Sequence, residues 1–443
     1  MAGDYPLTQI GELASSISDT HKFGKEQLVF LNTSDILHGK FLHRTYSAVK
    51  DWPGQAKKSI CKDDILFSEI RPANGRWAYV EEDADDFVVS TKLMVIRAKQ
   101  DRLFPKFLYQ FLTSSEITKW LQHLAESRSG TFPQITFDQV ATLELPLPPL
   151  AEQKAIAAVL GALDDKIELN RRMNATLEAM ARALFQSWFV DFDPVRAKLD
   201  GRKPIGLDET TAALFPDSFQ ESSLGHIPKG WEIGTLGSIL DVLETGRRPK
   251  GGVGSYTSGV PSVGAESING IGVFDYSKTK YIPPQFFEKT SSGRVAHFDV
   301  LLYKDGGKPG EFRPRVGLFG HDFPFKTFCI NEHVFRMRSV RTGQSFLFFT
   351  TSHQRVLDDF ANKGGKAAIP GINQPDVKST PIVLPPKELT DAFNARADLL
   401  CDQILHNAKQ SRTLATMRDT LLPKLLSGEL SVADFTARMP AEI

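Results

Sequence analysis

The chain has 443 residues, enough for two to four domains, and its 41% hydrophobic and 24% charged residues are typical of globular proteins. The 53 basic and 53 acidic residues cancel, so any polyanionic partner must be recognised by local patches. Three widely spaced cysteines, Cys61, Cys329 and Cys401, exclude a disulfide framework and make a cytoplasmic location the expectation. We find no signal-peptide pattern and no apolar window of about 18 residues that would predict a membrane span.

Residues 1–149 are predicted to form a first mixed α/β domain. Strand-like runs at Gln27–Leu31, Phe87–Ser90 and Leu93–Ile96 are interrupted by Gly and Pro turns, and a helix is predicted over Pro105–Ala125. The domain has 17 basic and 19 acidic residues, a net charge of −2. Its cationic turns suit phosphate contacts, and its candidate nucleic-acid-binding residues are Arg44, Arg71, Asn74, Arg76 and Arg128.

A long helix is predicted to follow over residues 150–190, because the chain has no proline between Pro149 and Pro194. Its apolar positions step alternately by 4 and 3 residues, which is the heptad pattern of a coiled coil. The seam consists of Ile156, Leu160, Leu163, Ile167, Asn170, Asn174, Leu177, Ala181, Leu184 and Trp188. At about 1.5 Å per residue, such a helix is a rod of roughly 60 Å.

Residues 191–228 have little periodicity and are interpreted as an ordered connector to a second mixed α/β domain over 229–386. Strands are predicted at Val300–Tyr303 and Val334–Met337, and a helix over Gln344–Asn362. This domain has 20 basic and 14 acidic residues, a net charge of +6. Its basic residues lie beside glycines, where cationic side chains and backbone amides approach a phosphate together. The candidates are Arg247, Arg248, Lys250, Lys304, Lys308, Arg313, Arg315, Lys363 and Lys366.

Residues 387–443 are predicted to form a second long helix and a C-terminal tail. This helix repeats the seam of the first at a constant offset of 237 residues. Its seam is Phe393, Ala397, Leu400, Ile404, Asn407, Ser411, Leu414, Arg418, Leu421 and Leu425. We expect the two helices to pair as an antiparallel coiled coil, with the matched Asn170 and Asn407 fixing the register. The alternative is that each helix packs only on its own globular domain.

The two globular domains also echo each other. Asp64-Ile-Leu-Phe resembles Asp299-Val-Leu-Leu, and Pro133-Gln-Ile resembles Pro370-Gly-Ile. Cationic turns follow the first motif and precede the second in both domains, which favours a shared binding surface over ordinary solvated loops. The predicted fold class is therefore α+β, with two mixed α/β domains joined by two long helices in an internal pseudo-twofold repeat.

Motifs for catalysis are absent from the sequence. There is no Asn/Asp-Pro-Pro-Tyr element for base methylation, no phosphate-binding GxxxxGK[ST] loop and no GxSxG element. His321, Cys329 and His333 fit no common zinc spacing and are interpreted as core or loop residues. The fragment around Asp376 and Lys378 lacks the acidic strand residue that metal-dependent cleavage needs.

The arrangement resembles the specificity subunit of Type I restriction-modification systems. The resemblance covers essentially the whole chain. Its most specific motifs are Pro148-Pro-Leu-Ala-Glu-Gln-Lys154, Trp188-Phe189, Phe192-Asp-Pro194, Phe215-Pro-Asp-Ser-Phe219, Leu224-Gly-His-Ile-Pro-Lys-Gly-Trp231 and Leu422-Pro-Lys-Leu-Leu-Ser-Gly-Glu429. The second Pro-Pro departs from the pattern, since Lys387-Glu-Leu-Thr390 replaces the Glu-Gln element.

The resemblance implies a subunit without catalytic activity or a cofactor of its own. Its two target-recognition domains would each read half of an asymmetric, split sequence in double-stranded DNA, and its helices would dock two modification subunits. Those subunits would carry S-adenosylmethionine and methylate adenine, while restriction subunits would use ATP and Mg²⁺ to translocate and cleave DNA. The alternatives are a similar recognition subunit of a Type II enzyme, a coiled-coil scaffold that binds no DNA, and an enzyme fused to a recognition domain.

Overall fold

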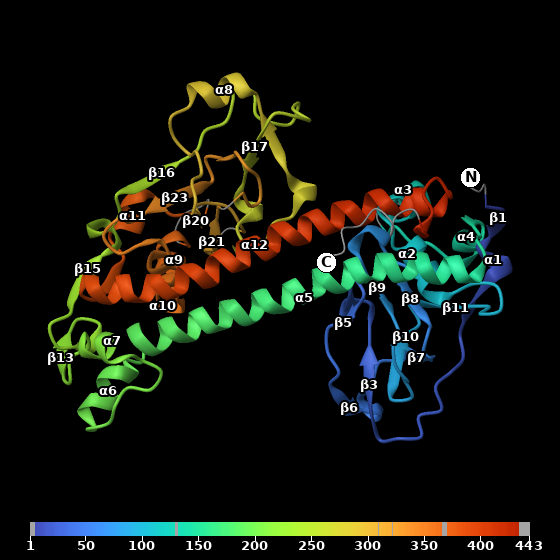
Figure 1. Ribbon diagram of the computed structural model, residues 1–443, viewed down its shortest axis with the longest axis horizontal. Helices are drawn as coiled ribbons and strands as arrows, with labels where there is room; N and C mark the ends of the chain where they lie inside the picture. The colour runs from blue at the N-terminus through green and yellow to red at the C-terminus, as the bar shows by residue number, and fades with distance from the viewer. Residues whose placement is uncertain (1–4, 129–131, 309, 321, 366–369, 434–443) are drawn as a thin grey trace. The chain divides into compact units, whose positions relative to one another are not determined.

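The computed structural model describes residues 5–128, 132–308, 310–320, 322–365 and 370–433, which form two compact units. Unit 1 comprises residues 1–166 and 413–443, and unit 2 comprises residues 167–412. Each unit contains one globular part and one segment of each long helix, α5 (Leu150–Phe189) and α12 (Lys387–Leu426) (Figure 1). Among the described residues, no helix is long and apolar enough to cross a membrane.

Unit 1 is built on two four-stranded sheets, of order β6-β3-β10-β7 and β2-β11-β8-β9. The strands are β2 (Ala14–Ile17), β3 (Gln27–Leu31), β6 (Tyr46–Ala48), β7 (Ala56–Ser59), β8 (Ile65–Ser68), β9 (Trp77–Tyr79), β10 (Phe87–Ser90) and β11 (Leu93–Ala98). The strands β3 and β10 are parallel, and the other neighbours are antiparallel. Two smaller pairs join β1 (Leu7–Gln9) to β12 (Glu144–Pro146) and β4 (Ile36–Leu37) to β5 (Lys40–Phe41).

Strand β8 is apolar at successive positions because both of its faces are buried. Ile65 and Phe67 point into a core shared with helices, whereas Leu66 points into the layer between the two sheets. Successive strand residues face opposite sides, so a strand buried on both faces needs an unbroken apolar run.

Unit 2 repeats this order. Its five-stranded sheet is β16-β23-β20-β21-β18, and its second sheet is β19-β17-β22, in which β17 is parallel to β22 as β3 is to β10. The strands are β16 (Val242–Thr245), β17 (Val260–Val263), β18 (Gly270–Ile271), β19 (Lys280–Ile282), β20 (Asp299–Tyr303), β21 (Val316–Phe319), β22 (Cys329–Ile330) and β23 (Val334–Arg338). The pair of β15 (Glu232–Thr235) and β24 (Pro381–Leu384) matches β1 and β12. The predicted α+β fold with an internal repeat is confirmed.

The two helices predicted over 105–125 and 344–362 are each interrupted, so both predictions of a single helix are wrong. Unit 1 has α2 (Pro105–Leu112) and α3 (Ser115–Arg128), separated where the Ser114 hydroxyl accepts from the Ile117 amide at 3.3 Å. Unit 2 has α9 (Gln344–Ser352) and α10 (Gln354–Gly364), separated at His353, whose ψ of 140° is extended. Side-chain and backbone turns at these joints replace helical hydrogen bonds, which periodicity alone does not reveal.

The connector forms α6 (Asp193–Leu199), α7 (Glu209–Ala213) and a hairpin of β13 (Phe219–Ser222) and β14 (Gly225–Pro228). Phe192, Phe215 and Ile227 insert into the core of unit 2 beside Trp188 and Trp231. The aromatic residues of the connector therefore fasten the end of α5 to unit 2.

The predicted seams face inward in both long helices. None of the twenty seam residues is exposed, and Ile156, Leu160, Ala181 and Trp188 of α5 are fully buried or nearly so. In unit 1, Ile156 of α5 shares a core with Leu425 of α12, and in unit 2, Trp188 shares one with Phe393. Early residues of α5 thus meet late residues of α12 within unit 1, and late meet early within unit 2, as antiparallel pairing requires (Figure 1).

Asn170 and Asn407 belong to a polar network inside the seam of unit 2. Asn170, 1% exposed, donates from Nδ2 to Gln410 Oε1 at 2.8 Å and to Ser411 Oγ at 3.2 Å. Asn407, 3% exposed, donates from Nδ2 to Asn174 Oδ1 at 2.9 Å. Asn174 is thus the partner across the seam, because the contact between the two matched residues is only a 3.4 Å approach to the Asn407 carbonyl.

We expect Asn407→Leu alone to lower the free energy of unfolding by about 1 kcal/mol, because the half-buried Asn174 oxygen loses its donor. Replacing Asn170, Asn174 and Asn407 together by Leu should be neutral or stabilising relative to the single variant. The two buried amides are removed together, and the partners that lose a contact, Gln403, Gln410 and Ser411, are exposed or half-buried and can bond to water. Urea unfolding followed by circular dichroism measures both. A triple variant less stable than the single one would contradict the assignment of the network.

The departure at the second Pro-Pro is compensated one helical turn later. In unit 1, the buried Gln153 accepts from the Phe104 amide at 2.8 Å and donates to the Arg102 carbonyl at 3.0 Å, which ties α5 to the start of α2. In unit 2, Asn394 accepts from the Phe346 amide at 2.9 Å and donates to the Thr342 carbonyl at 2.7 Å. The same junction is made by a different residue.

Candidate nucleic-acid interface

The cationic turn of unit 1 is held by the Pro-x-Ile motif. Arg71 adopts a left-handed conformation (φ 47°) and precedes the short 3-10 helix η3 (Pro72–Asn74). Its amide donates to the Pro133 carbonyl at 3.1 Å, and the Ile135 amide donates to the Glu69 carbonyl at 2.9 Å. The motif therefore pairs directly with the turn that carries Arg71 and Asn74.

In unit 2, the Pro-x-Ile motif pairs with a cationic turn in the same way. The Ile372 amide donates to the Lys304 carbonyl at 2.8 Å, and the Gly306 amide donates to the Pro370 carbonyl at 2.9 Å. Gly371 approaches Asp305 so closely that a Cβ there would lie 2.6 Å from the Asp305 Cβ. The Pro-x-Ile motifs of the two units thus hold their cationic turns through equivalent backbone hydrogen bonds.

A short helix begins directly after each Pro-x-Ile motif and fixes its direction. In α4 (Phe137–Ala141) Thr136 and Gln139 form a capping box, and in α11 (Gln374–Lys378) Asn373 and Asp376 form another. Reciprocal capping satisfies amides that the first helical turn leaves free.

Each cationic turn also contacts an element that is distant in sequence. In unit 1, the Ala73 amide donates to Gln122 Oε1 of α3 at 3.1 Å, so the turn lies against the helix that ends at Arg128. In unit 2, Phe312 packs so closely on Gly364 that a Cβ on the glycine would lie 2.4 Å from its ring. Gln122 was missed in the sequence, since nothing local marks it as a turn-holding residue.

The candidate residues divide into exposed side chains and side chains held by the protein. Arg71, Asn74, Arg247, Lys250 and Lys308 are exposed. Three others make internal hydrogen bonds: Arg76 donates to the Ser34 and Ile36 carbonyls, Arg315 to the Ala265 carbonyl and Asn269, and Lys363 to Asp359, Asp376, Ser379 and Thr380. Arg128 ends α3, and Lys366 lies outside the described residues.

The remaining candidates each pair with a carboxylate. Arg248 lies 2.8 Å from Glu332, and Lys304 lies 2.7 Å from Asp305. Arg44 pairs with Glu82, and Arg313 with Glu311. These cations are therefore partly neutralised in the free protein.

His333 connects two of these pairs in unit 2. Its Nδ1 contacts Asp305, and its Nε2 lies 3.4 Å from Glu332, which joins the 304–305 turn to the 247–250 turn. Burial alone would raise the pKa of Asp305, but hydrogen bonds from Lys304 and His333 outweigh it and hold that pKa below its ordinary value. No local sequence pattern predicts this chain of charged side chains.

The structure offers no metal cluster among the residues it describes. Cys329 is buried, and burial raises the pKa of its thiol to about 11. His321, the third residue considered in the sequence, lies outside the described residues.

A buried aspartate supports the turn in each unit. Asp64, fully buried, accepts from Arg97 at 2.7 and 2.8 Å and from the Cys61 amide at 2.7 Å. Asp299, also fully buried, contacts Arg336 and Arg338 and accepts from the Ala296 amide at 2.6 Å. Both pair with arginine on the neighbouring strand, which explains why aspartate begins both copies of the repeated strand motif.

Comparisons with known proteins agree with this arrangement. The family model for the Type I restriction modification DNA specificity domain matches residues 3–179. The chain is 34% identical to the Type I restriction enzyme HindI specificity subunit of Haemophilus influenzae, over 96% of this chain and 100% of that protein. It is 26% identical to the MjaIX specificity subunit of Methanocaldococcus jannaschii, over 76% of this chain and 71% of that protein.

The fold is similar to that of a solved structure. The crystal structure of the Type I restriction-modification S subunit from M. genitalium aligns with a TM-score of 0.55 and 14% identity, and covers 95% of this chain and 96% of that one.

Proposed function

This chain belongs to the family of Type I restriction-modification specificity subunits, and we propose that it reads a bipartite, asymmetric DNA target for a methyltransferase complex. The observation that carries the proposal is the equivalent pairing of a Pro-x-Ile motif with a cationic turn in both units. Two surfaces of common construction and different side chains suit two different half-sites.

We assign one half-site to the domain at 1–149 and the other to the domain at 229–386, with residues 150–190 and 387–443 as the helical spacers and 191–228 as the connector. The same strand order recurs in both domains, while their net charges of −2 and +6 differ. Exposed cations such as Arg71, Arg247, Lys250 and Lys308 would meet phosphates or base edges. Arg76, Arg315 and Lys363 would instead shape the turns, because their donors are already engaged.

The long helices would dock the two modification subunits. On α5 within unit 2, Leu169, Met173 and Met180 are 48%, 37% and 54% exposed. Their spacing places them along one face of the helix, away from the buried seam. Exposed apolar stripes of this kind are typical of protein interfaces, and methionine adapts readily to a partner.

The chemistry would lie in the partners. S-adenosylmethionine would bind the modification subunits, and ATP with Mg²⁺ the restriction subunits. This chain would contribute recognition of the DNA target sequence. The long match to Type I relatives favours this assignment over a Type II recognition subunit, and the two cationic turns favour it over a scaffold that ignores DNA.

We expect Arg71→Ala and Arg313→Ala to affect different half-sites. A base-reading arginine should cost about 1–3 kcal/mol at one position, because a bidentate contact is lost. The measurement is DNA binding by the assembled methyltransferase with each half-site randomised in turn. Arg202→Ala, an exposed arginine of the connector, is the control. Loss at the same half-site from both variants would contradict the division between domains.

We expect Glu332→Gln to strengthen binding to DNA of any sequence. Arg248, 2.8 Å from Glu332, would then meet a phosphate without first leaving a carboxylate. One additional phosphate contact steepens the slope of log K against log salt by about 0.9. Glu388→Gln makes the same charge change on an exposed residue at the start of α12 and should leave the slope unchanged. Equal slopes for both variants would show that Arg248 does not reach DNA.

A further inference from the structure

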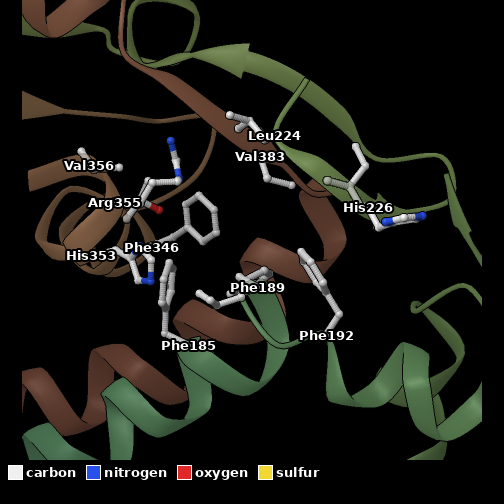
Figure 2. A pocket seen from close by; sticks show the side chains of 13 residues that line it. Phe185, Phe189, Phe192, Leu224, His226, Phe346, His353, Arg355, Val356 and Val383 are labelled. Atoms are coloured by element: carbon white, nitrogen blue, oxygen red, sulfur yellow. The ribbon is translucent and has the colours of Figure 1, made fainter. Parts of the chain in front are cut away.

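Unit 2 contains a cavity of about 160 Å³ that the proposed DNA-reading role does not use. Figure 2 shows aromatic side chains around it. Phe185 and Phe189 come from α5, Phe192 is the residue directly before α6, and Phe346 comes from α9. Leu224, Val356 and Val383 complete the apolar wall. A cavity of roughly 150 Å³ with apolar walls holds a benzene molecule, so the space suits one aromatic ring.

The wall of this cavity also carries polar groups. Thr350 of α9 is only 6% exposed, and its hydroxyl has no hydrogen-bond partner among the described residues. A buried hydroxyl without a partner is costly, and native proteins rarely keep one unless something else completes it. This hydroxyl therefore has hydrogen-bonding capacity that the described residues do not use.

Arg355 and His353 line the same space. Burial lowers the pKa of Arg355. The negative charge of Asp359 acts in the opposite direction but more weakly, so the pKa stays below its ordinary value. Burial, followed by the charge of Arg355, also lowers the pKa of His353. A partly buried guanidinium of this kind is stabilised by an anion placed beside it.

The start of α10 adds to the positive potential at this wall. His353 is the N-cap residue, but its side chain caps no amide, and the first backbone hydrogen bonds run from Val356 and Leu357 back to its carbonyl. The amino end of a helix carries a partial positive charge and favours anions. Helix end, guanidinium and hydroxyl thus line one small cavity.

We propose that this cavity is a binding site for a small aromatic carboxylate. The ring would lie among the phenylalanines, and the carboxylate would accept hydrogen bonds from Arg355 and from the Thr350 hydroxyl. A planar carboxylate matches the donor fork of a guanidinium. A single arginine and an aromatic lining suit a monoanion with an apolar body better than a bulky, strongly hydrated phosphate.

The test uses the full-length chain and phenylacetate as the probe. Isothermal titration calorimetry should show saturable binding of phenylacetate, and neutral phenylacetamide should bind at least about 10-fold more weakly, because a charge-assisted hydrogen bond is lost. Arg355→Gln and Thr350→Val should each weaken phenylacetate binding, the first by about 10-fold or more. Arg341→Gln, an exposed arginine that does not line the cavity, should leave the affinity unchanged.

No saturable binding of phenylacetate, or binding that both cavity variants leave unchanged, would overturn the proposal. Binding of phenylacetamide as tight as that of phenylacetate would overturn it as well, because the polar wall would then be unused. Unchanged circular dichroism of the Thr350→Val variant keeps the test valid if Arg355→Gln fails to fold. DNA binding is not a readout, so failure here leaves the DNA-reading role standing.

Discussion

Replacing Asp299 by Ala is expected to lower the free energy of unfolding of unit 2 by about 3–5 kcal/mol, because breaking a buried ion pair leaves uncompensated charge. Asp299 is fully buried and contacts both Arg336 and Arg338. Burial alone would lower the pKa of Arg336, but hydrogen bonds with Asp299 and with Glu244, the latter at 2.8 Å, raise it above its ordinary value. In the Asp299→Ala variant, Glu244 would be left to neutralise the Arg336 guanidinium.

Chemical unfolding of the full chain measures this effect. Asp391→Ala, which breaks an exposed pair with Lys387 on α12, is the matched control and should cost less than about 1 kcal/mol. Since β20 leads directly into the turn at Lys304, recognition of the second half-site should fall while the first is retained. An Asp299→Ala variant as stable as the control would show that the buried cluster contributes little.

Replacing Phe393 by Ala is expected to cost about 3–5 kcal/mol, the range for removing a fully buried aromatic ring. Phe393 is fully buried on α12, and its ring contacts those of Phe185, Trp188 and Phe189 from α5 at centroid distances of 5.9, 6.3 and 5.3 Å. It also contacts two rings of α9, Phe346 and Phe349. Its removal would leave a cavity between α5, α9 and α12 that the surrounding structure fills only partially.

The same unfolding assay distinguishes packing from helix propensity. Leu399→Ala on the same helix removes an apolar side chain that is 71% exposed and should change stability by less than about 0.5 kcal/mol. If Phe393→Ala cost no more than this control, the aromatic cluster would not be what holds α12 to α5 in unit 2.

The sequence by itself determined the repeat, the two long helices and their seams. Heptad spacing is a local property of each helix, so Ile156, Asn170 and Trp188 could be assigned to the inner face without knowing their partners. Apolar runs such as Val300–Tyr303 similarly predicted strands. The structure buries every residue of that strand, which is why the run is apolar throughout.

Only the tertiary structure decided how the candidate site is assembled. Pro133 pairs with Arg71 across more than sixty residues of chain, and no local pattern encodes such pairing. Which cations are exposed was likewise beyond the sequence, because Arg76 and Lys363 are engaged by carbonyls and side chains from distant segments.

Tertiary context also changed the meaning of single residues. The departure at Thr390 had no visible remedy in sequence, yet Asn394 rebuilds the junction one turn later, because a helix presents residues about four apart on one face. Asn174, an ordinary seam position by spacing, is the residue that Asn407 meets across the helices. Periodicity determines which face of an element is buried, whereas partners, charge pairing and cavities depend on which distant segments fold against that face.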